Sequence, residues 1–295
     1  MKWKRRGRSD DLIDRRGSSR GLGRGGGIPI PLGMLGKLGI PGLILMVIIV
    51  VISISGGTGI DGGVDSLQPG AGEPAADPLD PAEDPDAELV DFLSFVLDDI
   101  QDEWTELFRM SELEYERAEL VVFDGATQSA CGGAVEAVGP HYCPLDQRVY
   151  LDLSFFHELS QRYGARGDFA QAYVLAHEIG HHVQHLLGTM DRVRTAQQSS
   201  DDPNDLSIRL ELQADCFAGI WGYSTFQREL LESGDLQEAL NAASAVGDDR
   251  LQETATGRVN PETWTHGTSE QRMEWFRRGF DEGDPTSCDT FSGDV

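Results

Sequence analysis

The sequence feature that most constrains this chain is a pair of histidines, His177 and His181, with Glu178 between them, in a largely apolar stretch over residues 169–188. Residues four apart lie one turn apart on the same face of an α-helix. Two imidazoles in this arrangement can bind one tetrahedral Zn²⁺, and the glutamate between them can take a proton from water. A helix-capping aspartate precedes the stretch and a glycine ends it, so the pattern predicts a metal-binding helix.

A polar helix surface rich in histidine is the alternative interpretation. Against it, four of the chain's seven histidines fall within nine residues of an otherwise apolar helix. His182 lies about a hundred degrees around the helix from His181, and His185 is two turns from His177, so neither is expected to bind the metal. Leu187 stands where the metzincin motif has its third histidine, which excludes that version of the site.

A second helix, predicted over about residues 205–226, offers a third ligand. Glu211 lies thirty residues after His181, in a segment with apolar neighbours. Its carboxylate would complete a His₂Glu site with an open fourth position, which is the arrangement of a hydrolytic zinc. Asp215 lies one turn further and can accept a hydrogen bond from the other ring nitrogen of a ligand histidine. A solvated acidic face is the alternative, but unpaired buried carboxylates are costly, which favours metal and histidine partners.

A third group of residues lies near the C-terminus. His266 is the only histidine after the metal-binding helix, and it precedes a predicted helix start with Arg272 in the first turn. A histidine here can donate a hydrogen bond to the oxyanion of a tetrahedral intermediate, and Arg272 can hold or assist it. A histidine in a surface loop is the alternative, and these residues alone leave both interpretations open.

Charge divides the 295-residue chain, whose net charge is -26, into two parts. Residues 1–60 carry ten Lys or Arg and three Asp. Residues 61–295 carry fourteen Arg, no Lys and forty-seven Asp or Glu. Nucleic-acid binding needs a basic surface, so no nucleic-acid partner is expected for the acidic part.

The boundary between these parts contains a membrane signal. Residues 38–55 carry no charge and are mainly apolar, which predicts one transmembrane helix. The positive charges before it place a basic tail, residues 1–37, in the cytoplasm and the rest of the chain outside. A cleaved signal peptide would need an unusually long basic region, and no Ala-x-Ala cleavage site follows the apolar residues. A retained single-pass anchor is therefore the better interpretation. Residues 56–86 are rich in Gly, Asp and Pro and read as a linker.

The four cysteines all lie in the part expected outside the cytoplasm, and none shows Cys-x-x-Cys spacing. An even number of cysteines in such a compartment indicates disulfides. The separation of twelve residues makes Cys131 with Cys143 the favoured bridge. Cys216 with Cys288 then follows by elimination.

The remaining sequence predicts an α+β fold that is mainly helical with a small sheet. Apolar residues at helical spacing predict a helix of about twenty residues that begins near residue 87, and alternation over 148–153 predicts a strand. That strand is a candidate for pairing with an extended substrate, and an ordinary internal strand is the equal alternative. Residues 190–204 are polar and predict a mobile surface segment. The folded domain is expected over 87–285, with a C-terminal tail over 286–295.

Three motifs in this order resemble the bacterial neutral zinc metallopeptidase family, in which an outer zincin-like domain follows a basic tail and one transmembrane helix. The motifs are His177-Glu-x-x-His181, Glu211-x-x-Ala-Asp215 and Thr265-His-Gly-Thr-Ser-x-Gln-Arg272. The last two are also similar, more distantly, to the HtpX and Ste24 gluzincin peptidases. The resemblance implies His177, His181 and Glu211 as ligands of Zn²⁺, Glu178 as general base, and His266 and Arg272 as stabilising residues.

The sequence therefore predicts a membrane-anchored zinc endopeptidase that cleaves a protein or peptide outside the cytoplasm. The alternative is a non-catalytic extracytoplasmic module that holds zinc for binding or scaffolding. The intact Glu178 favours the enzyme, because a structural zinc site has no use for a base.

Overall fold

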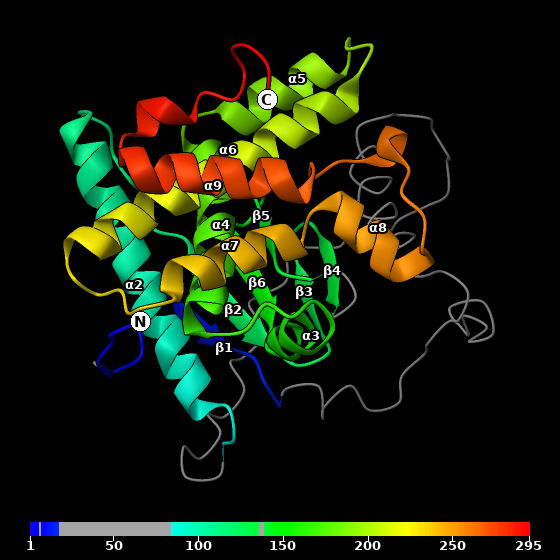
Figure 1. Cartoon of the computed structure of the whole chain (residues 1–295). Helices are drawn as coiled ribbons and strands as arrows, with labels where there is room; N and C mark the ends of the chain where they lie inside the picture. The colour runs from blue at the N-terminus through cyan, green and yellow to red at the C-terminus, as the bar shows by residue number, and fades with distance from the viewer. Residues whose placement is uncertain (6, 18–83, 136–138) are drawn as a thin grey trace, which may run out of the picture.

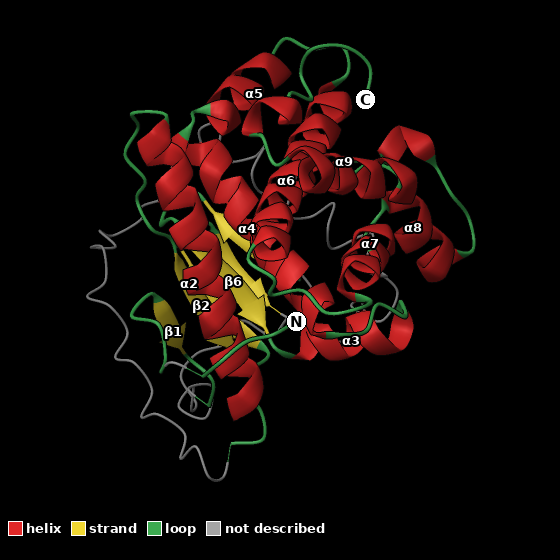
Figure 2. Ribbon diagram, turned by 60° about the vertical axis from the view of Figure 1, so that its left-hand side comes forward, coloured by secondary structure: helices red, strands yellow, loops and turns green. Residues whose placement is uncertain are grey.

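The computed structural model describes residues 1–5, 7–17, 84–135 and 139–295 (Figure 1). The described chain is mainly helical with a small mixed sheet, as the sequence predicts. Helices α2 and α4 lie against the sheet, and α6, α7 and α9 lie on the other side of α4 (Figure 2). The α-helices are α2 (Ala87–Met110), α3 (Ser154–Arg162), α4 (Asp168–Leu186), α5 (Thr189–Gln197), α6 (Pro203–Gln227), α7 (Asp235–Ala245), α8 (Asp248–Thr256) and α9 (Ser269–Glu282).

The main sheet has four strands in the order β1-β2-β6-β5. Strands β1, β2 and β6 are parallel, and β5 runs antiparallel to β6. The remaining strands form the antiparallel pair β3 and β4. The strands are β1 (Leu12–Asp14), β2 (Glu119–Phe123), β3 (Ala126–Ser129), β4 (Gly132–Val135), β5 (His141–Cys143) and β6 (Arg148–Asp152).

Strand β6 lies inside this sheet, between β2 and β5, so it is an internal strand and has no free edge for a substrate. The prediction of an extended substrate beside β6 is therefore wrong, and the internal-strand alternative is confirmed. Strand β5 is the edge strand on that side, with β6 as its one partner among the described residues. It also lies against α4, where Tyr142 contacts His182.

The N-terminal residues belong to the folded body. Leu12, Ile13 and Asp14 pair with Leu120, Val121 and Val122 of β2, and the backbone continues the pairing on both sides. The expectation of a separate tail over residues 1–37 is therefore wrong for residues 1–5 and 7–17. The sequence carries no clear signal for this packing, because strand β1 is only three residues long. Its partner, β2, lies more than a hundred residues further along the chain.

Two other expectations need correction. Most of the segment expected to be mobile, residues 190–204, forms helix α5, which packs on α6. The expected tail over 286–295 packs on the body as well, where Thr290 is 0% exposed and its hydroxyl donates to the carbonyl oxygen of Arg209. A short 3₁₀ helix, η5 (Pro285–Cys288), begins this segment. A second one, η4 (Pro261–Thr263), precedes α9.

The predicted transmembrane helix over residues 38–55 and the linker over 56–86 lie outside the described residues, except for the last positions of the linker. Within the described part of the chain, no helix has the length and apolar character needed to cross a membrane.

Both predicted disulfides are present. Cys131 is bonded to Cys143, which closes the β3–β4 region onto β5. Cys216 is bonded to Cys288, which fixes η5 to α6. The second bridge spans 72 residues of sequence and holds the C-terminal segment against the helix that carries Glu211.

Close helix packing builds the core around α6. A Cβ atom at Gly219 would lie 2.1 Å from the carbonyl oxygen of Phe276, and one at Gly279 would lie 2.0 Å from that of Cys216. Only glycine permits this approach of α6 to α9, so both helices run in direct backbone contact. The arrangement fixes α9, and therefore Arg272, against the helix that carries Glu211.

Candidate metal centre

Helix α4 carries the two histidines in a buried position. It is buried along most of its length, and His177, Glu178 and His181 are only 7%, 7% and 8% exposed. The helix prediction is confirmed, with bounds that differ by two residues or fewer from the expected ones. Charged and polar side chains this deeply buried need partners, so the neighbours of these three residues decide what the site can do.

A glycine on α4 allows α6 to approach. A Cβ atom at Gly180 would lie 2.9 Å from the carbonyl oxygen and 3.1 Å from the Cα atom of Ala214. Two small residues therefore face each other where the helices cross, and any larger pair would separate them. Glu211 precedes Ala214 by one turn, so the close crossing places its carboxylate over the two histidines.

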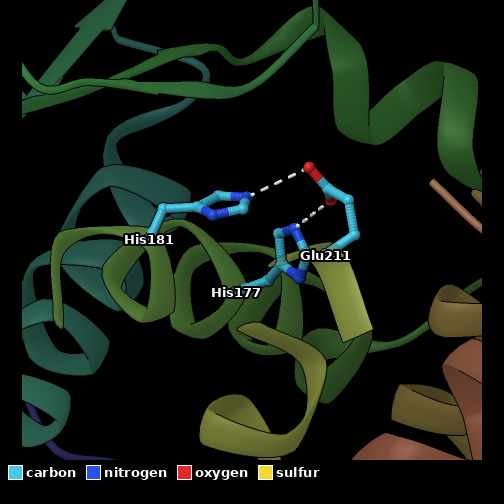
Figure 3. A group of neighbouring side chains, drawn as sticks. All are labelled: His177, His181 and Glu211. Atoms are coloured by element: carbon cyan, nitrogen blue, oxygen red, sulfur yellow. Dashed lines mark hydrogen bonds and ion pairs between the residues drawn. The ribbon is translucent and has the colours of Figure 1, made fainter. Parts of the chain in front are cut away.

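The three predicted ligands meet at one point (Figure 3). The Nε2 atom of His177 lies 3.1 Å from Oε2 of Glu211, and Nε2 of His181 lies 3.5 Å from Oε1. One ligand atom from each residue lies within 4.8 Å of the others. Ligand atoms about 2.1 Å from a tetrahedral zinc lie about 3.4 Å apart, so this donor set fits Zn²⁺.

The other ring nitrogens of both histidines have partners. Nδ1 of His177 lies 2.9 Å from Oδ1 of Asp215, and Nδ1 of His181 lies 2.9 Å from Oε1 of Gln184. An Nδ1–H that donates to each oxygen fixes the tautomer and leaves both Nε2 atoms free to bind a metal. The structure therefore brings Asp215 to the position that the sequence predicts, and it adds Gln184.

Arg272 lies beside His177, with its Nη2 atom 3.2 Å from Nδ1 and 3.4 Å from Nε2 of the ring. Its Nε and Nη2 atoms donate to the two carboxylate oxygens of Asp215 at 2.7 and 2.9 Å, and the residue is 2% exposed. The Tyr173 hydroxyl also donates to Asp215. The prediction that Arg272 holds His266 has no support in these contacts. Instead, Arg272 compensates the charge of the carboxylate that orients a ligand histidine.

Electrostatics favour a cation between the three ligands. Burial alone would lower the pKa of His177, but the Asp215 and Glu211 carboxylates outweigh it and raise the pKa to about 9. Burial likewise raises the pKa of Glu211, but the charge of His181 and hydrogen bonds from both histidines hold it well below its usual range. The carboxylates therefore remain ionised and attract positive charge to the site.

His266 is held by a residue that the sequence reasoning missed. Oδ1 of Asp248 lies 3.1 Å from Nδ1 of His266, and Oδ2 accepts the backbone N–H groups of Thr265 and His266, each at 2.6 Å. The Nε2 atom makes no hydrogen bond within the described part of the chain. Burial lowers the pKa of His266, but Asp248 and the charge of Glu211 outweigh it and raise the pKa. The carboxylate of Glu211, one of the candidate ligands, therefore contributes to the raised pKa of His266.

Two other histidines of α4 have separate roles. His182 is 0% exposed, with Nδ1 3.0 Å from the Tyr142 hydroxyl and Nε2 2.6 Å from the carbonyl oxygen of Glu116. His182 therefore ties α4 to β5 and to the loop before β2, and neither it nor His185 belongs to the ligand group.

Three residues of the site were missed for different reasons. Tyr173 lies four residues before His177, and Gln184 lies three residues after His181, so helical spacing alone could have suggested both. Asp248 is one of fifty acidic residues and lies 18 positions before His266, so no local signal distinguishes it.

Comparisons with known proteins identify the family of the chain. Residues 1–291 match the family model described as "Putative neutral zinc metallopeptidase". The chain is 45% identical over 299 residues to "Uncharacterized protein YpfJ" of Escherichia coli strain K12, with both chains covered completely. It is 49% identical over 189 residues to "Uncharacterized protein Rv2575" of Mycobacterium tuberculosis, which covers 60% of this chain and 64% of the relative. No solved structure matches the chain.

The family match begins at residue 1 and includes the N-terminal residues that pair with β2. It also includes all three candidate ligands and the residues that orient them. The chain belongs to the neutral zinc metallopeptidase family.

Proposed function

We propose that this chain is a zinc-dependent endopeptidase in which His177, His181 and Glu211 hold the metal. The observation that carries the proposal is the convergence of both Nε2 atoms on one carboxylate, with Nδ1 of each ring already bonded elsewhere. Zn²⁺ held by such a donor set lowers the pKa of a bound water and polarises a carbonyl group as a Lewis acid.

Glu178 is the general base of the proposed reaction. It lies between the two ligand histidines on α4 and is 7% exposed, so its carboxylate is shielded from bulk water. As a peptide bond is hydrolysed, Glu178 takes a proton from the attacking water and gives it to the leaving amine. Shielding strengthens this proton transfer because the competing solvent is excluded.

His266 assists by donating a hydrogen bond to the carbonyl oxygen as negative charge develops there. The contact with Asp248 occupies Nδ1 and leaves Nε2 to face a substrate. A raised pKa favours the protonated ring, which has a donor on both nitrogens. Preorganised donors of this kind stabilise a transition state more than a ground state.

An extended peptide can bind along β5. This strand is the edge of the sheet beside α4, and β6 occupies only one of its two sides. Backbone pairing on the other side would carry the scissile bond past the metal-binding helix without depending on the sequence of the substrate.

We also infer that the domain works outside the cytoplasm. Two disulfides among four cysteines, with no free cysteine in the described chain, support an oxidising compartment. A membrane helix over residues 38–55 remains a prediction from the sequence, and the ion pair of Arg16 with Asp84 joins residues on either side of it.

The test measures zinc content and casein cleavage for the full chain, for Glu178→Gln and for Glu274→Gln. Glu274 is an exposed residue of α9, so its variant controls for the loss of one negative charge. The parent should bind about one zinc and lose activity with a chelator, while Glu178→Gln should keep the metal and lose nearly all turnover. Undiminished cleavage by Glu178→Gln would contradict the mechanism. Zinc without cleavage in the parent would favour the non-catalytic module.

A further inference from the structure

The hydrogen bonds of Gln184 continue past His181 to helix α6. Its Oε1 atom lies 2.9 Å from Nδ1 of His181, while its Nε2 atom donates to the carbonyl oxygen of Leu210 at 2.7 Å and to Oε1 of Gln213 at 3.2 Å. The amide nitrogen has two N–H donors, and both are used here. Turning this amide over would place its oxygen against two other oxygens. Gln184 is 0% exposed, so these bonds keep its own oxygen directed at His181.

The Gln213 amide is oriented by the C-terminal segment. Gln213 lies on α6, two residues after Glu211, and its Nε2 atom donates to the carbonyl oxygen of Cys288 at 2.9 Å. With the nitrogen bonded to Cys288, the oxygen of the same amide faces Gln184. The reverse orientation would bring two oxygens together at one end and two NH₂ groups together at the other. One backbone carbonyl of η5 therefore sets the orientation of both amides.

A disulfide fixes that backbone carbonyl. Cys288 is the last residue of η5 and is bonded to Cys216, which lies three residues after Gln213 on α6. The Cα atoms of the two cysteines lie 5.6 Å apart, and both residues are buried. The covalent bond and the hydrogen bond from Gln213 therefore attach one residue of the C-terminal segment to one turn of α6.

The two candidate ligand histidines are thus oriented by different means. Nδ1 of His177 faces the carboxylate of Asp215, whose charge Arg272 compensates in the core. Nδ1 of His181 faces a neutral amide, which is a weaker acceptor than a carboxylate. If that amide turned over, the Nδ1–H of His181 would lose its acceptor, and a hydrogen on Nε2 would be favoured instead. Nε2 is the atom that has to bind the metal, so His181 depends on what holds Gln184 in place.

We propose that Gln213 is a positioning residue of the metal centre, which holds Gln184 in the orientation that serves His181. The carbonyl oxygen of Cys288, fixed by its disulfide with Cys216, in turn holds Gln213. This inference rests on the proposed role of His181 as a metal ligand. It adds that zinc affinity depends on the C-terminal segment, although that segment contributes none of the three candidate ligands.

The experiment compares the full-length parent with Gln213→Met and Gln213→Glu. Methionine has nearly the length of glutamine but lacks the amide, whereas glutamate keeps the acceptor for Gln184 and loses only the donor. Competition with a chelator should show zinc binding about tenfold weaker in Gln213→Met. Gln213→Glu should bind zinc at least as tightly as the parent, although a half-buried charge should lower its stability more than a thioether does. A residue that acted only through packing would show the opposite order of zinc affinities.

A second measurement needs no metal. In the zinc-free chain, NMR follows the exchange of the Gln184 side-chain N–H groups with solvent. Gln213→Met should accelerate this exchange by about tenfold, because one of the two acceptors is lost, and Gln213→Glu should leave it as in the parent. Unaltered exchange in Gln213→Met would overturn the proposal, and so would faster exchange with an unaltered zinc affinity. A parent that binds no zinc would instead contradict the proposed function, and this role of Gln213 with it.

The part played by the disulfide is tested by Cys216→Ser combined with Cys288→Ser. Zinc affinity should fall by about the factor seen for Gln213→Met, and adding Gln213→Met should lower it no further, because both changes act on one chain of bonds. Cys131→Ser combined with Cys143→Ser is the matched control, since that bridge lies in the β3–β5 region and should leave zinc affinity unaltered. Losses that multiply in the combined chain would overturn the coupling. The Gln213 variants keep all four cysteines, so they decide the proposal if the serine chain fails to fold.

Discussion

The Nδ1 atom of His177 and the Oδ1 atom of Asp215 lie 2.9 Å apart, on the side of the imidazole that faces away from Glu211. Asp215 is 0% exposed and also accepts hydrogen bonds from Arg272 and Tyr173. A candidate ligand histidine is therefore oriented by a carboxylate whose own charge is compensated inside the protein. Orientation of the ligand and stability of the core depend on the same group.

Asp215→Asn should weaken zinc binding by about 10- to 100-fold, because the amide is a poorer acceptor and orients His177 less firmly. Competition with a chelator of known affinity measures the change. Asp281→Asn is the matched control, since that residue lies on the exposed face of α9. Equal zinc affinity in the parent and in Asp215→Asn would show that this contact does not orient a ligand.

Arg272→Gln should act mainly on stability. The change leaves Asp215 buried without its cation, and breaking a buried ion pair costs about 3–5 kcal/mol. Denaturant unfolding of the full chain should therefore show a much lower midpoint. Arg278→Gln is the control, because Arg278 is an exposed residue of the same helix whose guanidinium lies over the Trp275 ring. A variant of unaltered stability with strongly reduced turnover would return Arg272 to the catalytic role that the sequence suggests.

The sequence predicts most residues of the candidate metal centre because their signals are local. On α4, one helical turn separates His177 from His181, with Glu178 between them. On α6, one turn separates Glu211 from Asp215. Periodicity identifies each helix, and zinc chemistry then pairs them. What the sequence cannot show is the crossing at Gly180 and Ala214, which depends on tertiary packing.

Helix α5, strand β1 and the partner of His266 could not be predicted from the sequence, because their signals are weak or come from residues far apart in the chain. Helix α5 is polar, with Val193 as one of its two buried residues, so it lacks the apolar stripe that predicts a helix. Strand β1 has three residues, and its pairing with β2 is decided by partners far along the chain. Asp248 contacts His266 only through the folded arrangement of α8 and the loop before α9.

His266→Ala should lower kcat by about a hundredfold, with a small change in KM and normal zinc content. The expected loss reflects a donor that acts mainly on the transition state. His157→Ala, at an exposed position of α3, is the matched control. Normal turnover in His266→Ala would assign this histidine to the surface of the loop, with no part in the reaction.

Asp248→Asn should shift the pH dependence of turnover. In the parent, Asp248 helps to raise the pKa of His266 above its ordinary value, so the protonated ring persists to higher pH. Without that carboxylate, His266 should lose its proton at lower pH. The alkaline limb of the kcat profile should therefore shift to lower pH. An alkaline limb at the same pH in both proteins would separate Asp248 from the titration of His266.

The packing of the N-terminal residues bears on the membrane topology of the chain. The Arg16 side chain is 1% exposed and donates to Asp14 at 2.7 Å and to Asp84 at 2.7 Å. Asp84 lies just before α2, beyond the apolar residues 38–55 in sequence. These contacts place Arg16 of the N-terminal segment against Asp84, at the start of the helical body. A single crossing by residues 38–55, with a cytoplasmic head and an external body, would separate the partners.

We therefore predict that the N-terminal segment and the helical body lie on the same side of the membrane in cells. Lys4→Cys marks the exposed N-terminal segment and Glu274→Cys marks the exposed face of α9. Both variants should react alike with a maleimide that cannot cross membranes, because the ion pair of Arg16 with Asp84 joins the two parts. Lysed cells supply the control, since both sites should then be labelled. Labelling of Glu274→Cys alone in intact cells would show that the chain crosses the membrane once, and that residues 1–17 leave the body when it does.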